Sequence, residues 1–413
     1  MLTRPTSHRL ALKSCALALA LPLLAARPAA PPKSAPAKSA PPKAASTSPT
    51  DSVLRLDAVL DSLRLVYHVP GLAAAVVERG RVVAIGAAGV TVAGGGRRLT
   101  VDDPLHIGSC TKSMTALAIA RLVEKHRLEW NTTLVDAIPE LLRETLPVYR
   151  NVRLGQLLTH RGGIPPYDDV SEDTLRQLNA VARAPDVIRY HFVRRVVNEA
   201  PAHEPGAAFD YSNAGYTLAA AMAENVTGKP WEDWLEELVF APLSMRTAGV
   251  GWPADRHHPD GARGHRCADS TVAEPEPLDS RYRLGAALGP GGDVHASIAD
   301  LARYVAFHLD GEMGRATRPP VAAETWRRLH RDPDGASPGY AMGWQVLPGD
   351  SARPVLFHDG TAGTFYTRML IEPGRDRAIV IATNAGPPCG KAACEQGVNA
   401  VLAWVKRMRG AGR

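Results

Sequence analysis

A serine and a lysine three positions apart, Ser109 and Lys112, are the residues of this sequence whose types and spacing best suit chemistry. On a helix, residues at i and i+3 share one face, so the Lys112 amine would lie beside the Ser109 hydroxyl and take its proton. A serine at the first turn of a helix also has free backbone N–H groups and the positive end of the helix dipole nearby, and both stabilise an oxyanion. One helical turn would therefore supply a nucleophile, its base and part of an oxyanion hole.

The alternative for this pair is ordinary helix chemistry, in which a serine caps the helix and a lysine follows one turn later. The sequence contains no other S-x-x-K, and this one stands between Gly108 and an apolar helical pattern over residues 109–126. It also follows a candidate hairpin. This context favours the nucleophilic interpretation.

A second candidate motif contains Tyr211 and Asn213, after a Glu-Pro-Gly turn and before an apolar pattern over residues 216–223. A phenol near an ammonium ionises more easily, so Tyr211 is a candidate general base for acylation or a candidate acid toward the leaving group. Asn213 is a candidate to bind both the carbonyl of a substrate and Lys112. The alternative is a packing tyrosine beside a turn asparagine.

The third motif is His358-Asp359-Gly360-Thr361, at the end of an apolar strand pattern. Two other His-x-Gly sequences occur in the chain, so the placement on a C-terminal strand is what distinguishes this one. We expect Gly360 to let a substrate backbone approach closely. Because side chains alternate along a strand, Asp359 should face away from the side shared by His358 and Gly360.

Helical and strand patterns around these motifs predict an α+β fold. Strand patterns near both chain ends enclose a middle region, 154–306, that is rich in helical patterns, Pro and Gly. We therefore expect an antiparallel sheet that is formed from both chain ends and flanked by helices (sheet lobe 51–105 and 340–408), plus a helical lobe (106–339). The predicted helices are 52–68, 109–126, 216–223 and 395–408, and the predicted strands are 72–77, 82–85, 340–346, 355–357, 368–371 and 378–382.

The order and context of the three motifs resemble the serine β-lactamase and penicillin-binding superfamily. The similar branch includes class C β-lactamases, D-Ala-D-Ala carboxypeptidases, D-aminopeptidases and related esterases. The resemblance extends over most of residues 52–408. Further segments that carry it are Leu157-Leu-Thr-His-Arg-Gly-Gly-Ile-Pro165, Gly228-Lys-Pro-Trp231, Ala241-Pro-Leu-Ser-Met245, Gly291-Gly292, Ser297-Ile-Ala-Asp-Leu301 and Thr383-Asn384.

The resemblance implies a β-lactamase/transpeptidase-like fold and a role for each motif residue. Ser109 would be acylated, and Lys112 and Tyr211 would share the base and acid roles. Asn213 would orient the substrate. The backbone N–H groups of Ser109 and Thr361 would form the oxyanion hole.

His358 would replace the lysine of the K-T-G motif found in many members of that superfamily. A neutral imidazole attracts a substrate carboxylate less than an ammonium does, so efficient β-lactam hydrolysis is the less expected activity. The implied protein is a serine hydrolase that needs no metal or cofactor and acts on a small ester, a D-amino-acid peptide or a β-lactam. The alternative is a penicillin-binding or peptidoglycan-binding protein with little or no turnover.

Composition excludes several other classes. The chain has 413 residues, of which 45% are hydrophobic and 22% charged, as in ordinary globular proteins. Its net charge of +6 comes from the first 50 residues, which hold seven basic and no acidic side chains, so the remainder carries −1. We therefore expect no nucleic-acid partner. The sequence has no H-E-x-x-H and no phosphate-binding glycine loop.

The first 50 residues predict export. A basic start, a short apolar stretch and small residues indicate a signal peptide over 1–30, and a Pro/Ala/Lys-rich linker follows over 31–50. The hydrolase domain would be 51–408, periplasmic or secreted, with no transmembrane segment after signal removal. In an oxidising compartment Cys389 and Cys394, which are close in sequence, could form a disulfide, although the sequence leaves the pairing open.

Overall fold

The described part of the chain lies within one compact unit, Ser48–Arg413. The predicted signal peptide and linker lie outside the described residues. No helix among the described residues is long and apolar enough to cross a membrane. The computed structural model describes residues 53–268, 274–280, 282–331, 339–349 and 353–410.

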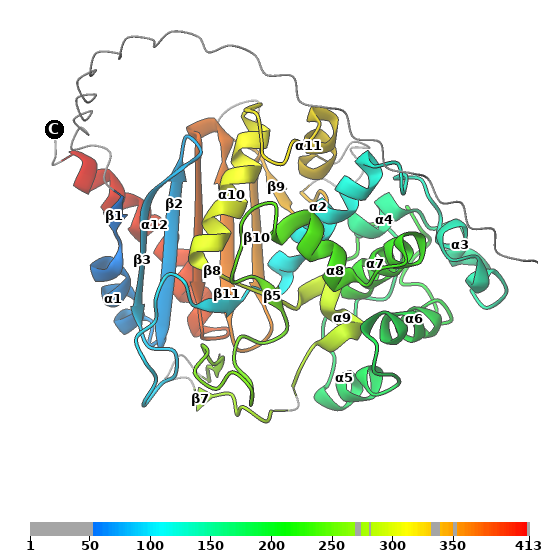
Figure 1. The fold of residues 1–413 in the computed structure, drawn as a ribbon, viewed down its shortest axis with the longest axis horizontal. Coiled ribbons are helices and arrows are strands. Elements are labelled where there is room, and N and C mark those ends of the chain that lie inside the picture. The colour runs from blue at the N-terminus through cyan, green and yellow to red at the C-terminus, as the bar shows by residue number, and fades with distance from the viewer. Residues whose placement is uncertain (1–52, 269–273, 281, 332–338, 350–352, 411–413) are drawn as a thin grey trace, which may run out of the picture. The chain divides into compact units, whose positions relative to one another are not determined.

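A seven-stranded sheet is built from both ends of the chain, as the sequence predicts (Figure 1). The N-terminal and C-terminal strands meet where β2 pairs antiparallel with β12. Every neighbouring pair in this sheet is antiparallel except β1 with β3. In spatial order the strands are β1 (Leu54–Arg55), β3 (Arg81–Gly89), β2 (Gly71–Glu78), β12 (Arg377–Thr383), β11 (Tyr366–Glu372), β10 (Val355–Thr361) and β9 (Gln345–Leu347).

Helices cover both faces of this sheet. The helices α1 (Asp57–Val66) and α12 (Cys389–Gly410) pack on one face with a separate apolar cluster. The helix α10 (Ile298–Glu312) lies across the other face and contacts β2, β11 and β12 (Figure 1). Because both faces are covered, β2 is buried along nearly its whole length, which explains its continuous run of apolar residues.

The remaining helices form a lobe beside the sheet, and α2 runs between the two parts (Figure 1). Two of them, α2 and α7, are apolar on nearly all sides and are buried accordingly. The helices of this lobe are α2 (Thr111–Glu124), α3 (Leu134–Ala137), α4 (Leu154–Leu158), α5 (Glu172–Asn179), α6 (Pro185–Val196), α7 (Asn213–Thr227), α8 (Trp231–Leu235), α9 (Gly285–Gly292) and α11 (Ala323–His330).

Short strands in the middle of the chain escape the sequence prediction because they have only two to four residues. The strand β8 (Val294–Ser297) pairs with β4 (Pro104–His106) and with β5 (Gly249–Val250). A two-stranded ribbon joins β6 (His265–Arg266) to β7 (Glu274–Pro275). The strand β4 ends directly before the turn that carries Ser109, so this small sheet anchors the candidate nucleophile.

The bounds of the predicted elements all shift in the structure, and the helix predicted over 395–408 begins earlier, at Cys389. The helix predicted over 52–68 is preceded by the short strand β1 and begins at Asp57. The strand predicted over 340–346 is reduced to β9, because Gly343 has a left-handed backbone (φ +80°) that interrupts the extended chain. Ser109 lies in a 3₁₀ turn, Gly108–Cys110, and α2 begins only at Thr111.

The suggested disulfide between Cys389 and Cys394 is wrong. Cys389 is bonded to Cys267, with a Cα–Cα distance of 6.0 Å, and Cys394 is a buried free thiol. Both Cys389 and Cys394 lie on α12, where positions i and i+5 point to different sides of the helix. The observed bond ties the loop after β6 to the start of α12.

Candidate active site

The turn around Ser109 packs directly against the end of β10. Gly108 has a φ of +51°, and a Cβ there would lie 2.2 Å from the backbone nitrogen of Thr361. A Cβ at Gly360 would lie 1.8 Å from the carbonyl oxygen of Ile107. Both glycines thus allow two backbones to touch, and Thr361 N is brought beside the Ser109 turn. The structure gives Gly360 a role in packing against the protein's own backbone, where the sequence suggested approach of a substrate.

Lys112 is fully buried on α2, and its Nζ lies 3.1 Å from Ser109 Oγ. Nζ donates hydrogen bonds to Asn213 Oδ1 at 2.6 Å and to the Gly291 carbonyl at 2.7 Å. These two oxygens can only accept hydrogen bonds. A neutral Lys112 amine would donate its two N–H groups to them, and its lone pair would then point toward Ser109. No carboxylate contributes to this set, and burial holds the pKa of Lys112 well below its usual range. The arrangement therefore favours a neutral amine that can accept the Ser109 proton.

Asn213 is fixed at the start of α7 by contacts from the segment that follows α4. Its Nδ2 donates to the Tyr167 carbonyl at 3.0 Å, which turns Oδ1 toward Lys112. Its backbone N–H donates to the Pro166 carbonyl at 2.8 Å. The preceding Ser212 caps α7 by accepting from Gly215 N at 2.9 Å. Helix capping and the 166–167 backbone together set the direction of the Asn213 amide.

Tyr211 lies on the other side of Lys112, whose Nζ is 4.6 Å from the centre of the phenol ring. Burial raises the pKa of Tyr211, and a hydrogen bond with the Ser109 hydroxyl only partly opposes this effect. The phenol therefore keeps its proton in the free protein. Of the two roles that the sequence leaves open for Tyr211, this favours proton donation to the leaving group over proton abstraction.

His358 does not present a cation to the pocket. Its Nδ1–H donates to the carbonyl of Asp359 at 2.6 Å, and its Nε2 lies 3.2 Å from the hydroxyl of Tyr340. The ring is 2% exposed, and burial lowers the pKa of His358 to about 4. Both ring nitrogens are thus occupied by the protein, and His358 is neutral at physiological pH. Tyr340, its partner, carries no motif signal in the sequence.

Asp359 faces the opposite side of β10, as strand alternation predicts. Its carboxylate accepts two hydrogen bonds from Arg368 on the neighbouring strand β11, at 2.6 and 2.5 Å. Arg368 also reaches Glu395 on α12. The negative charge of Asp359 is therefore paired on the α12 side of the sheet, away from Ser109.

A pocket of about 330 Å³ opens beside Ser109, and Asn213 and Thr361 also line it. Tyr167 and Tyr282 also line this pocket. The charged side chains in the lining are Asp168, Asp169 and Arg266, none of which belongs to a sequence motif described above. Arg266 is not a free cation, because Glu276 accepts from it at 2.8 and 3.2 Å.

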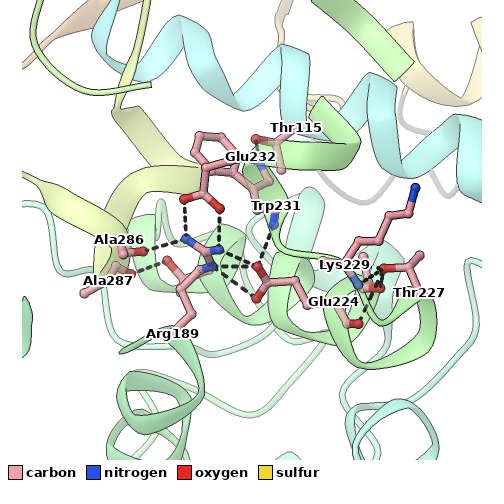
Figure 2. A network of polar contacts seen from close by, with 11 residues as sticks. Thr115, Arg189, Glu224, Thr227, Lys229, Trp231, Glu232, Ala286 and Ala287 are labelled. Atoms are coloured by element: carbon pink, nitrogen blue, oxygen red, sulfur yellow. Dashed lines mark hydrogen bonds and ion pairs between the residues drawn. The ribbon is translucent and has the colours of Figure 1, made fainter. Parts of the chain in front are cut away.

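The Gly291 carbonyl that accepts a hydrogen bond from Lys112 belongs to α9, a helix weakened by four glycines and an internal Pro290. Proline has no N–H to donate to the carbonyl four residues earlier, that of Ala286. Figure 2 shows that the buried guanidinium of Arg189 reaches this carbonyl, at 3.4 Å. The Pro290 carbonyl accepts from Thr115 Oγ1 at 2.9 Å. Groups on other helices thus hold α9 where its own hydrogen bonds cannot.

Thr115 is in turn fixed by Trp231, whose indole N–H donates to Thr115 Oγ1 at 3.2 Å (Figure 2). The same corner holds the ion pairs of Arg189 with Glu224 and Glu232, at 2.5 and 2.7 Å. Thr115 lies one turn after Lys112 on α2. This helix therefore carries the Lys112 amine and also the hydroxyl that holds Pro290, the residue before Gly291. These supporting residues were not found from the sequence because they act through backbone carbonyls.

The described residues contain no group of three or more His, Cys, Asp or Glu side chains that is placed to hold a metal ion. The chemistry of the cluster rests on a hydroxyl, an amine, a phenol and an amide. These groups are typical of serine hydrolases in which a lysine on a helix lies beside a serine at the start of that helix.

Comparison with known proteins identifies the family. The Beta-lactamase family profile matches residues 56–399. Penicillin-binding protein 4 of Amycolatopsis lactamdurans is 28% identical over 337 residues, which are 79% of this chain and 84% of the relative. Protein flp of Staphylococcus aureus (strain MW2) is 25% identical over 334 residues, and the match spans 81% of this chain and 63% of that protein.

Solved structures share the fold. The D-amino acid amidase of Ochrobactrum anthropi SV3 superposes with a TM-score of 0.64 at 21% identity, over 85% of this chain and 98% of the amidase. The D-alanine carboxypeptidase AmpC of Burkholderia cenocepacia gives a TM-score of 0.62 at 20% identity, over 83% and 95% of the two chains. The chain belongs to the Beta-lactamase family and is a serine hydrolase that acts through an acyl-enzyme on an ester or amide bond.

Proposed function

We propose that Ser109 is the residue that becomes acylated and that Lys112 is its general base. The observation that carries this proposal is the fully buried Lys112 amine, whose hydrogen-bond partners among the described residues are the neutral oxygens of Ser109, Asn213 and Gly291. The lone pair of Nζ takes the proton of Ser109 while Oγ attacks the substrate carbonyl. The backbone N–H groups of Ser109 and Thr361 stabilise the resulting oxyanion.

Tyr211 donates its proton to the leaving group when the tetrahedral intermediate collapses, and Asn213 holds Lys112 and the substrate. The C–O or C–N bond of the substrate breaks, an acyl-Ser109 ester remains, and the alcohol or amine departs with the phenolic proton. The proton on Lys112 then returns to Tyr211. Water subsequently hydrolyses the acyl-Ser109 ester and regenerates the hydroxyl.

The direct test is intact-mass spectrometry of the purified protein after treatment with a fluorophosphonate and, separately, with a penicillin. One adduct that is absent in Ser109→Ala would support Ser109 as the nucleophile. Ser113 lies on α2, close after Ser109, and donates to the Cys110 carbonyl at 2.8 Å. It supplies a matched control. Ser113→Ala should label like the wild type, whereas labelling of folded Ser109→Ala would contradict the assignment.

The substrate class that we favour is a small ester or a D-aminoacyl amide without a free carboxylate next to the scissile bond. His358 is neutral and occupied by Tyr340 and Asp359, and Arg266 is paired with Glu276. The pocket also carries the carboxylates of Asp168 and Asp169, which repel a substrate anion. Substrates with a neutral or positively charged end therefore fit the charges that line the pocket.

This preference is tested with pairs of substrates that differ only in one carboxylate, such as a D-aminoacyl glycine and its glycinamide. The amide should have the larger kcat/KM, and Asp168→Asn combined with Asp169→Asn should reduce the difference. A kcat/KM that is higher for the carboxylate member of each pair would contradict the preference. It would leave the assignment of Ser109 intact.

The second candidate function is a penicillin-binding protein that is acylated and then turns over slowly. Similarity to Penicillin-binding protein 4 of Amycolatopsis lactamdurans favours it. A burst of product equal to one equivalent of protein, followed by a slow steady state, would support this function over efficient hydrolysis.

Export of the protein, with a cleaved segment near residue 30, is tested by mass measurement of the protein from the culture medium or periplasm.

A further inference from the structure

His160 is a buried residue close to the candidate site that has no role in the chemistry proposed above. It follows α4 and is 2% exposed. Its φ of +57° lies in the left-handed region, which non-glycine residues other than Asn, Asp and His rarely adopt. The surroundings must hold such a conformation in place, so the contacts of His160 indicate what the conformation achieves.

Two hydrogen bonds of His160 enclose Tyr211 along the chain. The His160 carbonyl accepts from the backbone N–H of Asp210 at 2.8 Å. The ring Nδ1 accepts from the backbone N–H of Ser212 at 3.0 Å. The residues before and after Tyr211 are thus both bound to one histidine, and together these bonds fix the backbone from which the Tyr211 side chain extends.

The imidazole ring also packs against the Tyr211 phenol, with 4.3 Å between ring centres. On its other sides the ring contacts Tyr340 at 4.7 Å and Tyr216 at 5.3 Å. The Tyr216 hydroxyl donates to the Leu158 carbonyl at 2.8 Å, so the segment that leads to His160 is itself tied to α7. The side chain of Tyr211 therefore rests against a ring that cannot move freely.

These contacts require a neutral imidazole. Because Nδ1 accepts from Ser212 N, the proton resides on Nε2, which is buried and has no hydrogen-bond partner among the described residues. Burial lowers the pKa of His160 well below its usual range. A protonated ring would lose the bond from Ser212 and would place a positive charge near Lys112.

We propose that His160 is the positioning residue for Tyr211 and that it keeps the phenol directed at Ser109 and the departing group. This inference rests on the proton-donor role proposed for Tyr211. His160 does not touch the reacting atoms. It acts through the Asp210 and Ser212 amides and through the Tyr211 ring. The inference also gives a role to one residue of the segment 157–165, which the resemblance identified without assigning a role.

The test uses two substrates with the same acyl group, a p-nitrophenyl ester and a p-nitroanilide. The phenolate departs without a proton, whereas the aniline nitrogen needs one, so loss of a correctly placed acid slows the anilide selectively. We expect Tyr211→Phe and His160→Leu each to lower the anilide rate, relative to the ester rate, by about a hundredfold, which is a typical effect of a misplaced catalytic group. A general loss of structure would lower both rates equally.

A double-mutant cycle then shows whether His160 acts through Tyr211. In the Tyr211→Phe background, His160→Leu should change the anilide-to-ester ratio by less than about threefold, because the group that it positions is already absent. His160→Asn tolerates the left-handed backbone and offers an oxygen to Ser212 N, so it should recover at least about tenfold of the ratio lost in His160→Leu. His160→Ala serves the same cycle if His160→Leu does not fold.

Three results would overturn the inference. A normal anilide-to-ester ratio in His160→Leu, alongside a lowered ratio in Tyr211→Phe, would contradict the positioning role of His160 and leave the role of Tyr211 intact. An undiminished effect of His160→Leu in the Tyr211→Phe background would show that His160 acts elsewhere. A normal ratio in Tyr211→Phe would remove both the proton-donor role of Tyr211 and the inference that rests on it, while labelling of Ser109 would still report on the nucleophile.

Discussion

Lys112 and Arg189 are both fully buried basic residues near α9, yet their surroundings favour opposite charge states. Arg189 lies against two carboxylates, Glu224 and Glu232 (Figure 2). Burial opposes its charge, but the hydrogen bonds to Glu232 and Glu224 outweigh that effect and raise the pKa of Arg189. Lys112 has only neutral acceptors, and burial lowers its pKa.

The difference separates a structural cation from a reactive amine. A buried charge with carboxylate partners stays charged and ties helices together, here α6, α7 and α8. A buried amine with amide and carbonyl partners keeps its two N–H bonds and gives up the third proton. The type of partner, more than the depth of burial, decides which of the two functions a buried basic residue performs.

Replacement of the reactive amine should have the largest effect. Lys112→Met should lower the rate of Ser109 acylation by about 10²–10⁴-fold, because the proposed general base is lost. Lys112→Arg should be as slow as Lys112→Met, since a guanidinium stays protonated at every accessible pH. Stopped-flow measurement of acylation by a p-nitrophenyl ester gives both rates. Substantial recovery in Lys112→Arg would mean that position 112 contributes charge and not proton abstraction.

Replacement of the structural cation should act on stability. Arg189→Met leaves the buried Glu224 carboxylate without its partner and should lower the free energy of unfolding by about 3–5 kcal/mol. Arg194→Met is the matched control on the same helix, because Arg194 forms an exposed pair with Glu144 whose side chains are 43% and 41% exposed. That change should cost less than about 1 kcal/mol. Urea denaturation measures both, and equal losses would contradict the distinction.

A carboxylate placed beside Lys112 should make it resemble Arg189. In Asn213→Asp the new charge favours the ammonium, so the pKa of Lys112 rises by about 1–3 units. A raised pKa means that the free amine exists only at higher pH. The acidic limb of the plot of kcat/KM against pH should therefore move toward alkaline pH, with partial recovery of rate there. A rate that falls equally at all pH values would point to lost substrate binding alone.

The smallest effect should come from the support of α9. Thr115→Val keeps the side-chain shape but removes the hydroxyl between Trp231 and the Pro290 carbonyl. The lost hydrogen bond holds Pro290, the residue before Gly291, and contributes about 1 kcal/mol of stabilisation. Its loss should slow acylation about fivefold. Thr115→Ser keeps the hydroxyl and should behave like the wild type. Equal rates in Thr115→Val and the wild type would show that α9 holds its position without this bond.

Local patterns predicted the fold well. The sheet from both chain ends and the helix after Ser109 follow from apolar spacing, which the structure confirms. The proximity of Ser109 and Lys112 follows from helical geometry alone. The strands β4, β5 and β8 were missed because two to four residues carry no periodicity.

Contacts between distant parts of the chain set the remaining features of the site. The Gly291 carbonyl is 179 positions from Lys112, and a backbone acceptor has no residue signature. The burial of His358 depends on Tyr340, which lies in an irregular segment where the sequence predicted a strand over 340–346. The partner of Cys389 is 122 positions away in a loop. The roles of Ser109, Lys112 and Tyr211 in catalysis stay predictions.

The pH dependence of Ser109 labelling tests most directly whether Lys112 works as a neutral amine. The second-order rate constant for modification by a fluorophosphonate is measured from pH 5 to 11, with intact mass confirming one adduct that is absent in Ser109→Ala. We predict that the rate reaches its plateau well below the usual lysine pKa of about 10.4. A rate that keeps rising tenfold per pH unit up to that value would contradict the account, because Lys112 would then be an ordinary ammonium in the resting protein.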